Sequence, residues 1–124
     1  MAKRILLVDD ERDLVFYTKL FLEEKGYEIL EAYDGRQALD VLEEETPDLV
    51  VLDVAMPRLS GWDVLRIMQD DDRMKDIPVL MLTARAEDAD KAKGWTLGVT
   101  WYQPKPFELD ELALVIDRIL AIGG

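Results

Sequence analysis

Short apolar segments that recur along the chain constrain its fold more than any other feature of the 124-residue sequence. Five segments have the length and composition of β-strands, and they are residues 5–8, 28–32, 49–52, 77–82 and 99–102. The residues between them carry apolar side chains at helical spacing, so strands and helices alternate along the whole chain. This alternation is typical of an α/β fold, in which helices cover both faces of a parallel sheet with right-handed crossovers.

The composition of the strand segments predicts their order in the sheet. The first, third and fourth segments are apolar throughout, as expected for central strands that are covered on both faces. The second is half polar and the fifth carries Pro104, so both are expected at the edges, where proline is tolerated. The resulting order, 2-1-3-4-5, defines a flavodoxin-like three-layer sandwich, a single domain over residues 1–124, with a crevice at the carboxyl ends of strands 1 and 3.

Local signals predict where several helices begin and end. Asp34 is a candidate N-cap, Ser60 and Asp63 resemble a capping box, and Gly26 stands where a helix commonly ends. The segment 87–97 is the weakest of the expected helices because it contains few large apolar side chains. A weakly held helix is suited to a change of position.

The residue types that are absent exclude several functions. The chain has neither cysteine nor histidine, so it has no thiolate or imidazole zinc site, no Ser-His-Asp triad and no phosphodonor histidine. Its 15 basic and 27 acidic residues give a net charge of −12, which opposes binding to the nucleic-acid backbone. No segment approaches the roughly 20 apolar residues that span a bilayer. We therefore expect a cytoplasmic protein that does not itself bind nucleic acid or membrane.

Acidic residues gather at the expected carboxyl ends of neighbouring strands. Asp9 and Asp10 follow strand 1, and Asp53 ends strand 3. Carboxylates about 4 Å apart repel each other by roughly 1–4 kcal/mol, depending on the effective dielectric, and a divalent cation removes this repulsion. A set of oxygen ligands alone favours Mg²⁺. Thr83 and Lys105 end strands 4 and 5, and a hydroxyl and an ammonium at the same edge suit phosphoryl transfer to the Asp53 carboxylate.

Each of these residues has a structural explanation when it is taken alone. An acidic pair after a strand is most often a helix cap, a threonine is usually a hydrogen bonder, and a Lys-Pro pair is usually a turn. Their joint occurrence at the ends of strands 1, 3, 4 and 5 favours a functional site. The segments that carry them resemble the receiver domain of bacterial two-component response regulators, over nearly the whole chain: ILLVDDE (5–11), PDLVVLDVAMPRLSGWDVL (47–65), IPVLMLTA (77–84) and YQPKPF (102–107).

The resemblance implies a role for each matching residue. Asp53 matches the aspartate that accepts a phosphoryl group from the phosphohistidine of a sensor histidine kinase or phosphotransfer protein. Asp10 resembles the direct Mg²⁺ ligand, Asp9 the ligand that acts largely through water, and Ala55 the residue whose backbone carbonyl binds the metal. Glu11 has already left the strand end, so it is not expected to hold the metal. Such a chain is not an enzyme in the usual sense, because it would catalyse only its own phosphorylation and dephosphorylation.

The resemblance also implies how phosphorylation is signalled. Thr83 and Lys105 would contact the phosphoryl group, and the bond from Lys105 to Pro106 is expected to be cis. Tyr102 matches the switching aromatic residue, and we expect it on the strand face opposite Lys105, pointing toward the fourth helix. Trp101 stands where the family often has an acidic residue, and we expect it to be exposed.

The expected output surface is formed by the fourth helix, the fifth strand and the fifth helix. Trp95 and Trp101 lie on or beside it, and exposed tryptophan is enriched at protein interfaces. We therefore expect this surface to bind the downstream partner, which is either a second copy of the chain or a separate target protein. The sequence leaves open the cognate kinase, the oligomeric state and the presence of an output domain in a longer protein.

Three other functions fit parts of the pattern. A haloacid-dehalogenase-like phosphatase also uses an aspartate at a strand end, but it needs a second acid where this chain has Ala55. A flavodoxin-like flavin carrier binds phosphate after strand 1, where Asp9, Asp10 and Glu11 would repel it. A receiver-like module that binds partners without phosphorylation is the strongest alternative, although it is typical of chains that have lost an active-site residue.

Overall fold

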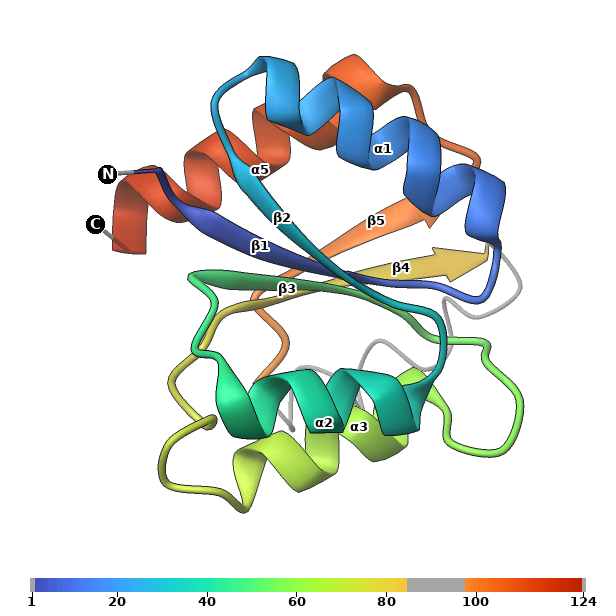
Figure 1. Ribbon diagram of the computed structural model, residues 1–124, viewed down its shortest axis with the longest axis vertical. Coiled ribbons are helices and arrows are strands. Elements are labelled where there is room, and N and C mark those ends of the chain that lie inside the picture. The colour runs from blue at the N-terminus through green and yellow to red at the C-terminus, as the bar shows by residue number, and fades with distance from the viewer. Residues whose placement is uncertain (1, 85–97, 124) are drawn as a thin grey trace.

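The computed structural model describes residues 2–84 and 98–123 of the chain. Within these ranges strands and helices alternate as follows (Figure 1): β1 (Arg4–Val8), α1 (Arg12–Glu24), β2 (Glu28–Ala32), α2 (Gly35–Glu44), β3 (Leu49–Asp53), α3 (Gly61–Gln69), β4 (Val79–Ala84), β5 (Trp101–Lys105) and α5 (Leu109–Gly123). The helix expected at 87–97, together with its Trp95, lies outside the described residues.

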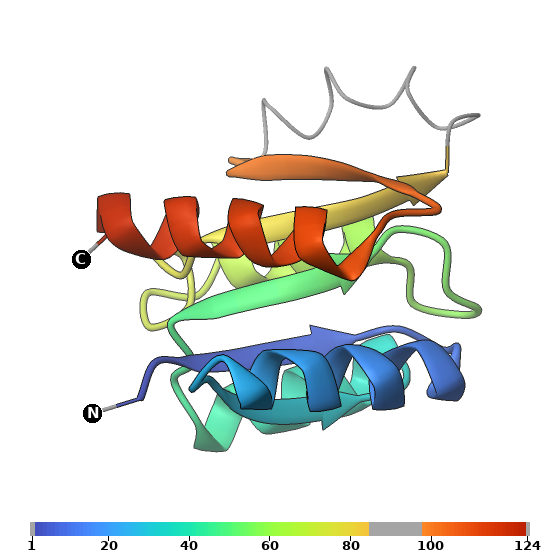
Figure 2. The same ribbon diagram turned by 90° about the horizontal axis from the view of Figure 1, so that it is seen from above.

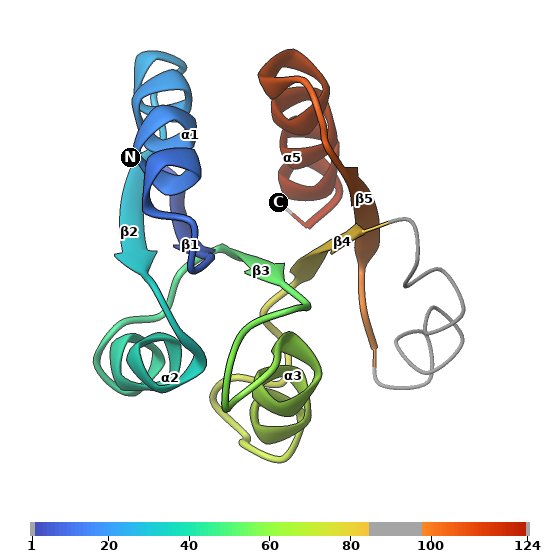
Figure 3. The same cartoon turned by 90° about the vertical axis from the view of Figure 1, so that its right-hand side faces the viewer.

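The strands form one parallel sheet in the order β2-β1-β3-β4-β5, which confirms the order expected from the sequence. Figure 3 shows α1 and α5 on one face of this sheet and α2 and α3 on the other. Figure 2 shows α1 and α5 lying against the same face. The described part of the chain is therefore a three-layer α/β sandwich, as predicted.

Apolar side chains from the central strands fill the space between the layers. Several of the largest fully buried side chains come from these strands: Ile5, Leu6, Leu49, Leu52, Leu80 and Met81. Burial on both faces explains why β1 and β3 are apolar almost throughout. Among the described helices, none is long and apolar enough to cross a membrane.

The last two strands lie further along the chain than the apolar pattern predicts. β4 begins directly after Pro78 and continues to Ala84, which is paired with Lys105 at the end of β5. Apolar residues mark the buried part of a strand, whereas backbone pairing continues into the polar residues beyond it. Thr83 and Lys105 lie in these strands, near their carboxyl ends, as expected. Pro104 lies within β5, the edge strand of the described sheet.

The predicted helix ends are confirmed. The side chain of Asp34 caps α2 by accepting a hydrogen bond from the Gln37 amide over 2.8 Å. Ser60 and Asp63 form the reciprocal hydrogen bonds of a capping box at the start of α3. Gly26 follows α1 with a φ of +98°, a left-handed conformation that favours glycine. These local signals fix where the connections leave the helices.

Candidate functional site

The carboxyl ends of three strands bring two buried acids and a lysine together. Asp9 directly follows β1, Asp53 is the last residue of β3, and Lys105 is the last residue of β5. The Lys105 Nζ lies 2.8 Å from Asp9 Oδ2 and 3.4 Å from Asp53 Oδ1. Asp9 and Asp53 are only 3% and 5% exposed, so the ammonium compensates carboxylates that are largely removed from water. The peptide bond from Lys105 to Pro106 is cis, as expected.

The loop after β3 is held close to Asp53 by Gly61. A Cβ atom at position 61 would lie 2.3 Å from the Asp53 carbonyl oxygen and 2.9 Å from the Val54 Cα, so the site requires glycine. The Gly61 amide donates a hydrogen bond to the Val54 carbonyl over 2.9 Å. Because α3 begins at Gly61, the helix and the strand end that carries Asp53 are fixed relative to each other.

Asp10 adds a third carboxylate to the two buried ones. One carboxylate oxygen from each of Asp9, Asp10 and Asp53 lies within 4.8 Å of the others, and Asp10 is exposed whereas the other two are buried. This set of oxygen donors suits a hard divalent cation such as Mg²⁺. The backbone of Ala55 makes a hydrogen bond with the Asp53 carboxylate. The metal-binding role expected for the Ala55 carbonyl stays a prediction.

Burial and neighbouring charge raise the pKa of Asp53 to about 7. Burial is the largest cause, the Asp9 carboxylate adds to it, and Lys105 opposes both. Burial works to lower the pKa of Lys105, but the hydrogen bond to Asp9 and the charge of Asp53 outweigh it, so the pKa is raised. Lys105 is therefore cationic at neutral pH, whereas Asp53 divides between its protonated and ionised forms. A divalent cation would favour the ionised form, which is the nucleophilic one.

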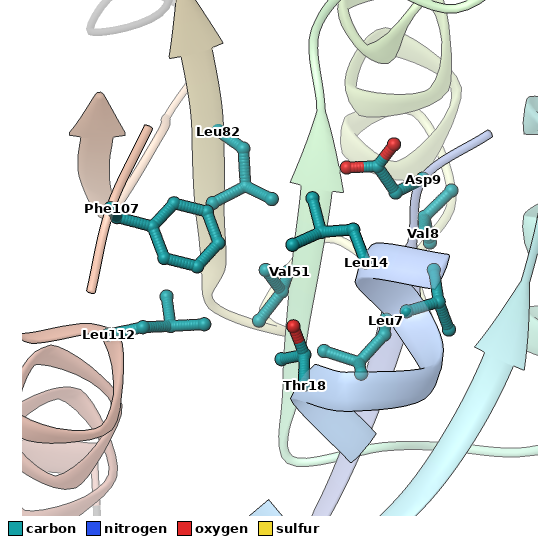
Figure 4. A pocket seen from close by; sticks show the side chains of 10 residues that line it. Leu7, Val8, Asp9, Leu14, Thr18, Val51, Leu82, Phe107 and Leu112 are labelled. Carbon is teal, nitrogen blue, oxygen red and sulfur yellow. The ribbon is translucent and has the colours of Figure 1, made fainter. Parts of the chain in front are cut away.

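Apolar walls below the acids explain why their charges act strongly on each other. Figure 4 shows the Asp9 carboxylate at the rim of a small cavity of about 10 Å³, which Leu14, Phe107 and neighbouring aliphatic side chains line. Thr18 also lines this cavity, and its hydroxyl has no hydrogen-bond partner among the described residues. With so few dipoles on this side of the site, charge at Asp9 is weakly screened and raises the pKa of Asp53.

Thr83 lies in β4, next to the strand that carries Asp53. It is 1% exposed, and its Oγ1 makes no hydrogen bond within the described part of the chain. A buried hydroxyl without a partner is uncommon, because burying such a group costs free energy. The hydroxyl is thus available to a ligand at the strand ends, and its expected contact with a phosphoryl group stays a prediction.

Tyr102 and Trp101 occupy opposite faces of β5. Tyr102 is 9% exposed, and its ring centroid lies 6.4 Å from that of Trp62 in α3. It belongs to the core between the sheet and α2 and α3, on the face opposite Trp101 and Lys105. Trp101 is 41% exposed, as expected. The fourth helix, toward which the Tyr102 ring is expected to point, lies outside the described residues. Among the described aromatic rings, Tyr102 packs near Trp62.

Glu11 belongs to the site in a way that the sequence analysis missed. The group of three close carboxylates consists of Asp9, Asp10 and Asp53, and the expectation that Glu11 does not hold the metal stays a prediction. However, the Glu11 carboxylate turns back to the site, where Oε1 lies 3.2 Å from the Lys105 Nζ. The signal that could have shown this contact is the run of three consecutive acids beside a strand-end lysine, which offers that lysine more than one partner.

Comparison with protein families identifies the class to which this fold and acidic site belong. The model of the response regulator receiver domain matches residues 5–117, and the chain belongs to this family. The chain is 42% identical over 120 residues to PhoP of Bacillus subtilis, an alkaline phosphatase synthesis transcriptional regulatory protein, with 97% of the chain covered. It is 44% identical over 117 residues to the transcriptional regulatory protein CpxR of Escherichia coli K12, with 94% covered. The match covers 49% of each relative, so the chain spans about half their length.

Solved structures of receiver proteins share the fold. The chemotaxis protein CheY4 of Vibrio cholerae superposes with a TM-score of 0.89 at 30% identity, over 95% of this chain and 98% of that one. The receiver domain of response regulator 1452 of Francisella superposes with a TM-score of 0.90 at 29% identity, over 98% of this chain and 99% of that one. Both superpositions extend over nearly the whole chain.

Proposed function

We propose that the chain accepts a phosphoryl group on Asp53 from the phosphohistidine of a partner histidine kinase or phosphotransfer protein. A carboxylate oxygen of Asp53 forms a bond to phosphorus while the bond from phosphorus to the imidazole nitrogen breaks. The electron pair of the broken bond stays on the imidazole, which takes up a proton. The observation that carries this proposal is the convergence of Asp9 and Lys105 on the buried Asp53 carboxylate.

The proposal includes a Mg²⁺ ion at the strand ends. Asp9, Asp10, Asp53 and the backbone carbonyl of Ala55 would hold it, and the close approach of the three carboxylates supports this assignment. When bound, Mg²⁺ neutralises charge on the carboxylates and on the phosphoryl oxygens. With the ion bound, Asp53 would be ionised at neutral pH and its carboxylate able to attack.

Two further side chains would act on the phosphoryl group itself. The Lys105 ammonium, which already lies 3.4 Å from Asp53, would bind one phosphoryl oxygen and stabilise its charge. The buried Thr83 hydroxyl would donate a hydrogen bond to another oxygen. Both groups lie on strands of the sheet, Thr83 on β4 and Lys105 on β5.

Chemical phosphorylation tests the assignment of Asp53. The protein is incubated with Mg²⁺ and acetyl phosphate, and its intact mass is then measured. We expect the wild type to gain one phosphoryl group and Asp53→Asn to gain none. Asp13→Asn, which removes an acid from the first turn of α1 outside the acidic group, is the matched control and should behave like the wild type. Equal uptake by Asp53→Asn would contradict the assignment, and no uptake by the wild type would favour the module that works without phosphorylation.

The proposal extends to an output surface that includes β5 and α5. Trp101 on β5 is 41% exposed and Leu114 on α5 is 59% exposed, which supports a role in partner contact. We propose that phosphorylation draws Thr83 inward, makes room for Tyr102 and so changes this surface for a second copy or a separate target. Trp95, the remaining residue expected there, lies outside the described residues.

Tryptophan emission and self-association test the output surface. In Trp62→Phe only Trp95 and Trp101 remain, and phosphorylation with Mg²⁺ is expected to change their emission. Trp101→Ala is expected to weaken partner binding, measured for a second copy by analytical ultracentrifugation, while Asp53 phosphorylation stays intact. Unchanged emission at full phosphorylation, verified by mass spectrometry, would show that this surface is not coupled to the site.

A further inference from the structure

Glu11 is the third carboxylate around the Lys105 ammonium, and it differs from the other two in exposure. Its Oε1 lies 3.2 Å from the Lys105 Nζ, compared with 2.8 Å for Asp9 and 3.4 Å for Asp53. The Glu11 side chain is 64% exposed, whereas those of Asp9 and Asp53 are 4% and 7% exposed. Glu11 therefore holds the ammonium from the solvent side of the site.

The structure gives the Glu11 side chain no role in capping the helix that follows it. Glu11 is the N-cap residue of α1, but its side chain makes no capping hydrogen bond. Its ion pair within the described ranges is with Lys105. The Glu11 amide donates to Asp9 Oδ1 over 3.0 Å, while Asp9 Oδ2 accepts from Lys105. Glu11, Asp9 and Lys105 thus form a closed ring of contacts that fixes the position of the ammonium.

We propose that Glu11 is a positioning residue that restrains the Lys105 ammonium and competes for it with a phosphoryl group on Asp53. Within the described residues, the ammonium donates hydrogen bonds to Asp9 and Glu11, and Asp53 is the most distant of its three carboxylates. In the proposed exchange, the ammonium turns from Glu11 toward Asp53 as it donates to a phosphoryl oxygen. The contact with Glu11 is then lost, so it stabilises the unphosphorylated state. This inference rests on the proposed function of Asp53.

Binding of beryllofluoride, a noncovalent mimic of the phosphoryl group, tests the competition. Its half-saturating concentration is measured at a fixed Mg²⁺ concentration for the wild type, Glu11→Gln and Asp13→Asn. We expect Glu11→Gln to lower this concentration about two- to fivefold, which is the range that an exposed ion pair provides. Asp13→Asn removes the same charge from the first turn of α1 and should leave the value unchanged. Equal values for the two variants would overturn the proposal, because net charge alone would then explain any change.

The nitrogen resonance of the Lys105 ammonium gives a readout that is independent of affinity. Glu11→Gln is expected to shift this resonance in the free protein. With saturating beryllofluoride and Mg²⁺, the wild type and the variant should give the same resonance, because Glu11 no longer contacts Lys105. Coinciding resonances in the free proteins would overturn the proposal.

The outcomes separate this inference from the proposed function. If the wild type and Glu11→Gln bind beryllofluoride equally well, the assignment of Asp53 stands and the role of Glu11 is wrong. If neither protein binds beryllofluoride and neither is phosphorylated by acetyl phosphate, the proposed function is wrong and the inference falls with it.

Discussion

Opposite ends of the sheet each place one cation among several carboxylates, but the two arrangements differ in burial. At the amino end of β1, the Arg4 guanidinium lies 3.5 Å from Glu28 and 2.7 Å from Glu45. The Arg4 amide also donates to Asp48 over 2.8 Å. At the carboxyl end, Lys105 lies among Asp9, Glu11 and Asp53 at similar distances. The lengths of the ion pairs, 2.7–3.5 Å at one end and 2.8–3.4 Å at the other, therefore do not distinguish the ends.

Burial of the carboxylates is what distinguishes them. The side chains of Glu28 and Glu45 are 59% and 44% exposed, whereas those of Asp9 and Asp53 are 4% and 7% exposed. Water screens the exposed ion pairs of Arg4 with Glu28 and Glu45, so these pairs contribute little to stability. At the carboxyl end, burial and the repulsion between Asp9 and Asp53 raise the pKa of Asp53 to about 7. The same kinds of residue thus form solvent-screened ion pairs at one end and a buried group of unlike charges at the other.

Alanine in place of glycine should have the largest effect, and the effect should differ between the two ends. Gly61→Ala would put a Cβ 2.3 Å from the Asp53 carbonyl oxygen, so we expect a loss of at least about 3 kcal/mol in the free energy of unfolding. It should also slow phosphorylation, because the strand end must move. At the other end, Gly26→Ala meets no atom within 4 Å and costs only the strain of its positive φ, about 1–2 kcal/mol.

Urea denaturation and acetyl phosphate labelling of both glycine variants provide the measurements. Gly26→Ala serves as the control for phosphorylation, and it should be labelled at the wild-type rate. Equal losses of stability at both positions would show that the backbone around Asp53 can move away from a Cβ at position 61 without loss of stability.

Removal of the buried charge should stabilise the protein when no divalent cation is present. Asp53→Asn in EDTA at about pH 8 should raise the free energy of unfolding by about 2–3 kcal/mol, because ionised Asp53 is buried beside Asp9. The native state of the wild type binds a proton more tightly than the unfolded state does. Wild-type stability should therefore fall as pH rises from about 4 to about 7.

Asp53→Asn should lack the pH dependence that Asp53 causes. Its gain in the free energy of unfolding over the wild type should therefore shrink as the pH falls through the pKa of Asp53. Urea denaturation across this range measures the difference. Glu45→Gln is the matched control at the exposed end, and we expect it to give no gain. If Asp53→Asn were less stable than the wild type at about pH 8, the proposed repulsion between Asp9 and Asp53 would be contradicted.

Mg²⁺ should reduce the repulsion among the carboxylates of Asp9, Asp10 and Asp53 and leave the ion pairs of Arg4 unaffected. At a concentration tenfold above its dissociation constant, Mg²⁺ should raise the free energy of unfolding of the wild type by about 1.4 kcal/mol. Asp10→Asn should lose most of this gain, whereas Glu11→Gln should keep it, because Glu11 is outside the acidic group. Thermal unfolding with increasing Mg²⁺ measures both, and a melting temperature indifferent to Mg²⁺ would count against the metal site.

Replacement of the cation at the amino end of β1 should have the smallest effect. Arg4→Met is expected to lower the melting temperature slightly, because the carboxylate partners of Arg4, Glu28 and Glu45, are exposed. About 0.5 M sodium chloride should remove most of the difference, since salt screens surface charges. A difference that persists in high salt would mean that the Arg4 pairs are less accessible to water than their exposure indicates.

Residues whose place depends on strand order or on the local backbone were predictable from the sequence. The carboxyl ends of parallel strands meet at one edge, so the order of the strands was enough to bring Asp9, Asp53 and Lys105 together. Asp34 and Ser60 cap helices through hydrogen bonds within a few residues, so their neighbours in the sequence defined them. Both predictions needed only the alternation of strands and helices and the chemistry of helix ends.

Contacts between distant side chains were not predictable in the same way. The pairing of Glu11 with Lys105 depends on the rotamer of a long, exposed side chain, and 94 positions separate the two residues. The packing of Tyr102 on Trp62 depends on how α3 lies across the sheet, whereas an apolar pattern shows only which face is buried. The ends of β4 and β5 were misplaced because pairing continues past the apolar residues.

The proline inside β5 weakens the sheet at the end that carries the site. The Thr100 amide donates to the Val79 carbonyl over 3.0 Å, and alternate amides of a strand point to the same neighbour, so position 104 is one whose amide would face β4. Pro104 has no amide N–H and is paired with Thr83, so the ladder lacks a donor there. We therefore expect local opening, as measured by amide hydrogen exchange, to need less free energy beside Thr83 and Lys105 than at the Val79 end of the β4–β5 pair. On this expectation, the end of the pair that opens more readily is the one that carries the hydroxyl and the ammonium.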